Sequence, residues 1–111
     1  MKQLKLSNKC NHEMLINYGF KKYGMDYKMF IPLYKKNDET LIEYEIVISL
    51  ADKHIQNTVV DVCNDSLYMA YYDQNQFGTN IVLEKVKSAI DKILNDLTDK
   101  DIITKGCSDI E

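Results

Sequence analysis

The chain contains no arginine and only four glycines among its 111 residues. Phosphate-cradling loops need several closely spaced glycines, and the absence of such a cluster excludes a P-loop or a dinucleotide-binding turn. Guanidinium is the group best suited to bidentate recognition of guanine and phosphate, whereas lysine supplies only a point charge. The lack of arginine therefore argues against sequence-specific reading of DNA.

The chain also has few cysteines and no long apolar run. Cys10, Cys63 and Cys107 are an odd number, at spacings that fit neither a disulfide framework nor a zinc motif, so we expect free thiols in a reducing compartment. The longest apolar runs, such as residues 46–50, are far shorter than the roughly 20 residues that a membrane span needs. The N-terminus lacks the apolar core of a signal peptide. These absences predict a cytoplasmic protein that binds no membrane and no cofactor.

The composition is that of an ordinary globular protein, with 45% hydrophobic and 28% charged residues. A chain of this length buries one core and is too short for two. We therefore expect a single domain over residues 1–98. Residues 99–111 are expected to be a fraying helix end and a disordered tail, because Gly106 and its polar neighbours offer little to bury.

Two segments have the apolar spacing of amphipathic helices. The first is expected from about residue 8 to residue 18, and Gly19 suits the left-handed position that ends a helix. The second, from residue 81 to about 97, has the clearer pattern, with Thr79 or Asn80 as its N-cap.

Between these helices the pattern predicts strands at residues 20–22, 27–34, 40–50, 54–63 and 67–72. Gly24 suits the tight turn between the first two, and the third alternates with its even-numbered residues inward. The fourth does not alternate cleanly, since Ile55 and Val59 lie on one parity and Val60 and Val62 on the other. We expect a bulge at residues 57–59 that switches its inward side.

This order of elements predicts an α+β fold. We expect an antiparallel sheet of four to five strands with the N-terminal and C-terminal helices packed on one face, and the opposite face in contact with water. Pro32 lacks an N–H group, so it places its strand at an edge or marks an interruption near the strand's end. An unprotected sheet edge also offers a route to a homodimer.

Candidate catalytic or metal-binding residues are few. Cys10 and His12 are close in sequence, and His54 is the other histidine. On a helix, residues two apart point about 200° away from each other, so Cys10 and His12 cannot bind one ion there. We expect no metal site and no catalytic residue. A small enzyme that depends on Cys10, His12 or His54 is one hypothesis, and it ranks below the two that follow.

The charge is unevenly distributed along the chain. Residues 1–36 hold eight lysines and two acids, a net charge of +6, whereas residues 37–111 hold six lysines and fifteen acids, a net charge of −9. Lysines attract nucleic-acid phosphate without reading sequence. A second hypothesis is therefore a nucleic-acid-associated accessory protein that uses Lys21, Lys22, Lys28, Lys35 and Lys36. The alternative interpretation is that these lysines form an ordinary solvated surface and bind nothing.

The leading hypothesis is a non-catalytic module that binds another protein through its sheet face. Acidic groups on that face would steer a basic partner toward it, and tyrosine buries a large area at low entropic cost. The expected partner-binding residues are Glu43, Glu45, Asp61, Tyr68 and Tyr72. A polar face that only keeps the protein soluble is the plainer interpretation of the acids.

Two short runs in the N-terminal third are distinctive: residues 17–24 (NYGFKKYG) and residues 27–30 (YKMF). With a long hairpin and a C-terminal amphipathic helix after them, they resemble small uncharacterised proteins of phages and mobile elements in low-GC Gram-positive bacteria. Frequent Lys, Asn and Ile without Arg is similar to the composition of those proteins. The resemblance implies no catalytic residue. It implies an inhibitor or accessory protein that acts on a host or phage protein complex, since some small acidic phage proteins block defence nucleases by occupying their surfaces.

Overall fold

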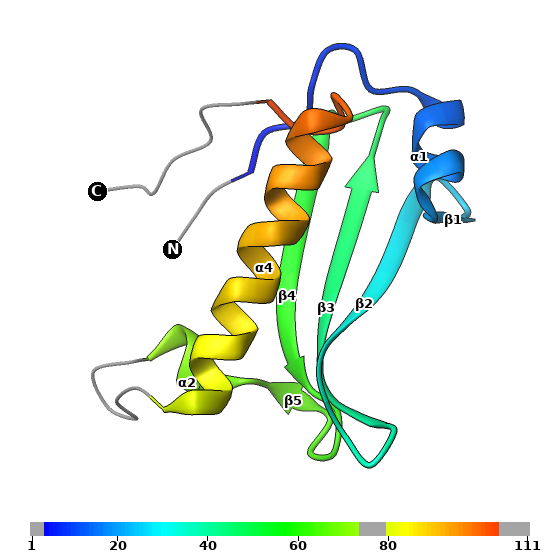
Figure 1. Cartoon of the computed structure of the whole chain (residues 1–111). Helices are drawn as coiled ribbons and strands as arrows, with labels where there is room; N and C mark the ends of the chain where they lie inside the picture. Colours follow the sequence, from blue (N-terminus) through cyan, green and yellow to red (C-terminus); the bar gives the residue numbers. More distant parts are fainter. Residues whose placement is uncertain (1–3, 74–79, 105–111) are drawn as a thin grey trace.

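The computed structural model describes residues 4–73 and 80–104 and contains a five-stranded antiparallel sheet in the order β1-β2-β3-β4-β5. Helix α4 lies along one face of this sheet (Figure 1). The elements in chain order are α1 (His12–Tyr18), β1 (Lys21–Tyr23), β2 (Asp26–Lys36), β3 (Glu39–Ser49), β4 (His54–Asp61), β5 (Ser66–Leu67), α2 (Met69–Tyr72) and α4 (Ile81–Asp99). The predicted α+β fold is confirmed.

Helix α1 is shorter than the pattern predicted, because its N-cap is Asn11. The Asn11 side chain accepts a hydrogen bond from the Met14 backbone N–H at 3.0 Å, whereas residues before it follow a non-helical path. Gly19 ends the helix as expected, with φ at 126°, a value that L side chains rarely adopt. A Cβ at this position would also lie 3.3 Å from the Met29 Cε, so the end of the Met29 side chain would have to shift by a few tenths of an ångström.

The core lies between the sheet and α4. The even-numbered residues of β3 from Ile42 to Ile48 are buried, which confirms the predicted alternation. They face the buried stripe of α4, which consists of Leu83, Val86, Ile90, Leu94 and Leu97. Burial of each such side chain contributes roughly 1.5–3 kcal/mol, so this layer is the main source of stability.

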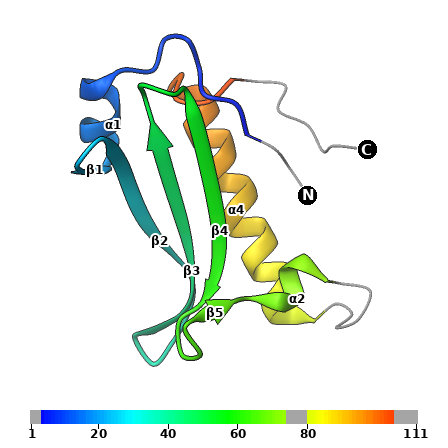
Figure 2. The same ribbon diagram turned by 180° about the vertical axis from the view of Figure 1, so that it is seen from behind.

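Helix α1 lies on the same side of the sheet as α4. The Tyr18 hydroxyl of α1 is close enough to the Asp96 carboxylate of α4 to lower the pKa of that carboxyl. On the same side, His12 Nδ1 lies 2.6 Å from the hydroxyl oxygen of Tyr27, whose side chain is buried. Seen from behind, β2, β3 and β4 have no described element in front of them (Figure 2). One face of the sheet is therefore covered and the other is bare.

Strand β4 has no bulge, so that prediction is wrong. Its pairing with β3 runs without a shift from Ile42 opposite Asp61 to Ser49 opposite His54. Asn57 keeps an inward position, because its side-chain oxygen accepts a hydrogen bond from the buried Tyr44 hydroxyl at 3.0 Å. The hydrogen bond to Tyr44 thus allows Asn57 to point toward the core, and β4 keeps the same inward side along its whole length.

The irregularity lies in β2 instead, next to Pro32. The register of β2 against β3 shifts between Pro32 and Lys35, and β1 pairs only with residues 26–28 of β2. The predicted interruption near Pro32 is confirmed. Pro32 also lies on the part of β2 that β1 leaves uncovered, where a missing N–H costs no ladder hydrogen bond.

The segment that was expected to be the last strand, residues 67–72, is mostly helical. Pairing with β4 ends at Leu67, and the N–H groups of Tyr71 and Asp73 then donate to the carbonyls of Tyr68 and Met69. Ala70 is buried inside this turn. A short apolar run does not distinguish a strand from a helical turn, which is why the prediction of a strand at residues 67–72 was wrong.

Packed chain continues beyond residue 98, the expected end of the domain. Helix α4 runs to Asp99, and Ile102 and Ile103 are buried in the core. Leu6 forms an isolated antiparallel bridge with Ile103, which ties the start of the described chain to its end. The rest of the expected tail, residues 105–111, lies outside the described residues. No helix in the described ranges is long and apolar enough to cross a membrane.

Candidate functional site

The side of the sheet away from α1 and α4 is called the open face here. Because side chains alternate along a strand, this face takes the residues between the buried ones. It consists of Lys21 and Tyr23 (β1), Asp26, Lys28, Phe30 and Pro32 (β2), Glu43, Glu45, Val47 and Ser49 (β3), His54, Gln56, Thr58 and Val60 (β4), and Leu67 (β5).

Strand register sorts these residues into four levels along the strands. One level, toward the β2–β3 hairpin, holds Pro32, Glu43, Val60 and Leu67 side by side. The next level holds Phe30, Glu45 and Thr58. The third holds Lys21, Lys28, Val47 and Gln56, and the fourth holds Tyr23, Asp26, Ser49 and His54. The face is thus apolar at one end and has two acids along its central strand, and Lys21, Lys28 and Asp26 lie together at one corner.

Large apolar side chains on this face are exposed to water. Phe30 is 49% exposed and Leu67 is 47% exposed, and Val62, which follows β4 on the same side, is 41% exposed. Scattered apolar residues are normal on a protein surface, whereas a group of them on one face is a feature that interaction sites share.

The two acids have no cationic partner within the described residues. Glu43 and Glu45 are two residues apart on β3, which separates their Cα atoms by about 7 Å, and each points to the open face. Strand neighbours across from Glu43 are Pro32 and Val60, so apolar groups border the charge on both sides. A carboxylate pair among apolar groups is a local negative potential that a lysine or arginine from another molecule would neutralise.

Lys21 and Lys28 form the basic corner of the open face. They are direct cross-strand neighbours, a placement in which like charges repel. The Lys28 Nζ lies 5.6 Å from the centroid of the Tyr23 ring, which offsets part of the repulsion through a cation–π interaction. Asp26 lies on the same face at the next level of β2 and adds a negative charge at this corner.

The other expected partner-binding residues do not lie on the open face. Asp61 points to the opposite side, and its carboxylate accepts from the Asn64 side chain at 2.8 Å in the turn after β4. Tyr68 donates its backbone N–H to the Val59 carbonyl at 2.9 Å, and the Tyr72 hydroxyl accepts from the Val59 N–H at 2.9 Å. Both tyrosine side chains are half-buried and pack against the core, and the Tyr72 hydroxyl also satisfies a backbone N–H at the outer edge of β4.

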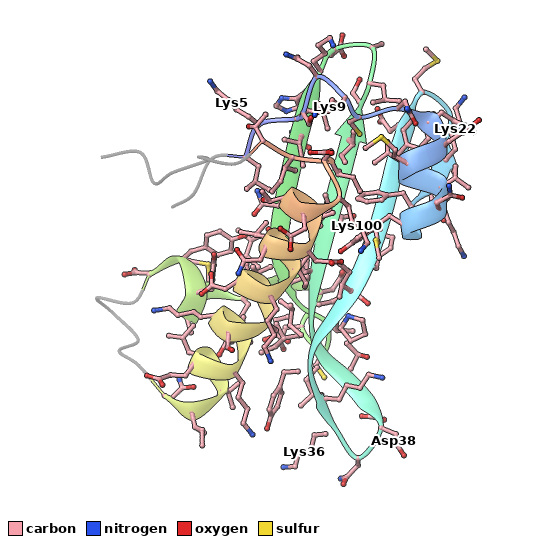
Figure 3. The ribbon with its side chains drawn as sticks, turned by 45° about the horizontal axis from the view of Figure 1, so that its top comes forward. Lys5, Lys9, Lys22, Lys36, Asp38 and Lys100 are labelled. Carbon is pink, nitrogen blue, oxygen red and sulfur yellow. The ribbon has the colours of Figure 1, made fainter. Side chains whose placement is uncertain are left out.

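The five lysines of the nucleic-acid hypothesis are spread over both faces and both ends of the sheet. Lys22 lies on the covered side, with its Nζ 6.0 Å from the centroid of the Tyr27 ring. Lys35 and Lys36 lie at the β2–β3 hairpin, and Lys36 pairs across it with Glu39. Figure 3 shows Lys22 beside α1 and Lys36 next to Asp38 at the far end of the hairpin. Of the five, Lys21 and Lys28 lie on the open face as cross-strand neighbours.

The cysteine and histidine candidates form no reactive cluster among the described residues. Burial raises the pKa of the Cys10 thiol, which makes it a poor nucleophile. His12 faces Tyr27 on the covered side, whereas His54 begins β4 on the open face. The described ranges contain no group of three His, Cys, Asp or Glu residues that could hold a metal ion.

The apolar part of the open face was missed in the sequence, although a signal was present. Val60 and Val62 broke the alternation of β4, and this was interpreted as a bulge. Val60 is instead an outward residue of a regular strand, and Val62 follows the end of that strand. Apolar residues on both parities of a strand indicate that both of its faces are used.

No protein-family model and no curated protein matches the chain. Among solved structures, the chain is similar to the crystal structure of a DUF1831 family protein from Lactobacillus plantarum, with a TM-score of 0.75 over 94% of this chain and 87% of that one. The two sequences are 14% identical, so the similarity shows the fold alone. The family is a domain of unknown function.

Proposed function

We propose that this protein is a non-catalytic interaction module that binds a partner protein through its open face. The observation that carries the proposal is the uncompensated pair Glu43 and Glu45, set among exposed apolar side chains on the one bare face of the sheet. The partner would present apolar groups together with a lysine or arginine opposite the two carboxylates. Fixed charges of this kind orient the approaching partner and raise the association rate, while the apolar contacts supply most of the affinity.

A phage-type inhibitor or accessory factor is the specific form of this proposal. The pattern of residues 17–30 and the composition resemble small phage proteins, and the acidic pair suits a basic surface such as that of a defence nuclease. Because Asp61, Tyr68 and Tyr72 have structural partners, Phe30 and Leu67 take their place beside Glu43 and Glu45 as the residues that bind the partner.

The experiment compares three versions of the tagged full chain in affinity capture from the native host. The variant E43K/E45K reverses the acidic pair. The control E13K/D99K makes the same change in net charge on α1 and α4, on the covered side of the sheet. We expect the wild type and the control to capture the same protein and the open-face variant to lose it.

The captured protein is then purified and titrated against each version by calorimetry. We expect E43K/E45K to bind at least about 10-fold more weakly, with the control unchanged, since one reversed pair of this kind costs more than about 1.4 kcal/mol. Equal affinity of all three versions would overturn the open face as the binding surface.

A further inference from the structure

Two aromatic rings lie exposed to water on the part of the open face that β1 and β2 form. Tyr23 is 52% exposed and Phe30 is 49% exposed, and β2 has no described element in front of it on this side (Figure 2). Phenylalanine and tyrosine usually bury most of a large side-chain area. Rings that stay exposed on paired strands present their flat faces to a planar group of another molecule.

Two lysines lie between the rings. Along the strands, Phe30 is at the second of the four levels and Tyr23 is at the fourth. Lys21 and Lys28 are side by side at the third level. Levels are about 7 Å apart, so the Cα atoms of the two ring residues are about 14 Å apart, with the lysines between them. The Lys28 Nζ lies 5.6 Å from the centroid of the Tyr23 ring, so a cation borders a ring on this surface.

We propose that this part of the open face binds single-stranded nucleic acid without reading its sequence. It is called the β1–β2 half here and consists of Lys21, Tyr23, Lys28 and Phe30. A single strand presents planar bases joined by phosphates, and proteins that bind it without sequence preference combine stacking rings with cations. One base stacks on Phe30 and another on Tyr23, and the phosphates between them contact the two lysines. This inference goes beyond the proposed function, which places a protein partner on the acidic pair of β3, and Phe30 borders both sites.

Three side chains of β4 at the same levels can form hydrogen bonds with the bases. Thr58 is at the second level, Gln56 at the third and His54 at the fourth, and all three lie on the open face. Hydroxyl, amide and imidazole groups both donate and accept hydrogen bonds, so they suit different base edges without selecting one base. Bases inside a duplex are stacked on each other and cannot reach the rings, so the ligand must be single-stranded.

The acids of the open face determine where the phosphates lie. Glu43 and Glu45 repel phosphate from β3, so the backbone of the nucleic acid follows β1 and β2. Asp26 lies one level from Lys28 and repels phosphate at the end of the β1–β2 half. These three acids oppose the two lysines and lower the affinity. Nucleic acid therefore binds despite Glu43 and Glu45, whereas the protein partner requires them.

Fluorescence anisotropy of the purified full chain tests the inference, with labelled oligouridylate and oligothymidylate of about ten nucleotides as the two probes. At about 50 mM salt we expect saturable binding of both probes at micromolar to sub-millimolar protein, the range of non-specific contacts. Y23A and F30A should each weaken binding about 5-fold or more, because each removes one stacked base. M25A is the matched control, since Met25 is 74% exposed in the turn beside Tyr23 and lies outside the β1–β2 half. Where an alanine variant does not fold, leucine replaces it, because leucine keeps apolar area without a ring.

The lysines are tested by charge reversal and by salt. K21E/K28E should weaken binding at least about 10-fold, whereas K35E/K36E, which makes the same charge change at the β2–β3 hairpin, should stay within about 2-fold of the wild type. Two contacted phosphates predict a loss of affinity of about 7-fold between about 50 and 200 mM salt, and K21A/K28A should lose most of this salt dependence.

Three results would overturn the inference: no saturable binding of either probe up to about 500 μM protein, ring and lysine variants that bind like the wild type, or a duplex of the same length that binds as tightly as the single strands.

The variant E43K/E45K separates this inference from the proposed function. It should strengthen binding of the oligonucleotides, because two repelling charges become attracting ones, and it should abolish binding of the captured protein. Weaker binding of the oligonucleotides by this variant would contradict the assigned path of the phosphates along β1 and β2. A chain that captures a protein through Glu43 and Glu45 but binds no oligonucleotide refutes this inference alone. A chain that binds the oligonucleotides but captures no protein refutes only the proposed function.

Discussion

Tyr44 and Asn57 form a polar pair inside the apolar layer between the sheet and α4. Tyr44 is 1% exposed, and its hydroxyl donates to the Asn57 side-chain oxygen. Burial raises the pKa of this hydroxyl above its ordinary value of 10.0, and nearby Tyr71 and Tyr72 add to the effect. The group therefore stays protonated as a donor, and the stability it contributes is lost as the pH rises above 10, where tyrosine ionises in the unfolded chain.

The pair predicts a coupled effect of mutation. N57V leaves the Tyr44 hydroxyl buried without an acceptor, at a cost of about 1–3 kcal/mol in the free energy of unfolding. The double variant Y44F/N57V removes both polar groups and should recover most of that cost. Urea unfolding of both single variants and the double variant gives the interaction energy directly. If the loss in unfolding free energy of the double variant equals the sum of the losses of Y44F and N57V, the pairing is contradicted.

At the scale of elements, Asp96 joins α1 to α4. The nearby Tyr18 hydroxyl lowers the pKa of the Asp96 carboxyl below its usual 3.8, and the hydrogen bond from Lys100, whose Nζ lies at 3.3 Å, lowers it further. A carboxyl whose pKa is lowered by folding contributes stability above its unfolded pKa and loses that contribution as the pH falls through this range. Docking of α1 is therefore expected to weaken in acid.

The variant D96N tests this link. Wild-type stability should fall between pH 6 and pH 3 by more than that of D96N, because the amide has no charge to lose. D99N is the matched control, since Asp99 lies on the same helix and forms no hydrogen bond or ion pair with any described residue. Urea titrations at several pH values measure the effect. If D96N and the wild type followed the same pH curve, the Tyr18–Asp96 contact would carry no stability.

The elements differ in how far the sequence determined them. The signals at Gly19, Gly24, Asn80 and the alternation of β3 are local, and the structure follows all four. The helical turn α2 and the regular course of β4 depend on partners distant in sequence. The Tyr68 N–H ends the sheet by bonding Val59, and Tyr44 keeps Asn57 inward. No local pattern contains those contacts.

At the scale of the whole molecule, the division into a covered and a bare side decides what can bind. The pattern of β3 was enough to place Glu43 and Glu45 on the bare side. It was not enough to place Asp61, Tyr68 and Tyr72, because their positions depend on the missing bulge and on α2. The apolar half of the candidate site emerged only from the register of β2 and β4.

The central claim is that α1 and α4 cover one side of the sheet and leave the other bare in the single chain. Thiol labelling at about 1 μM tests it, in a background where Cys63 and Cys107 are serine. T58C, on the open face, should react at the rate of a free thiol, whereas V59C, its neighbour on the covered side, should react at least about 100-fold more slowly. Equal protection of both positions at this dilution would show that the open face is covered by the protein's own chain and would contradict the account.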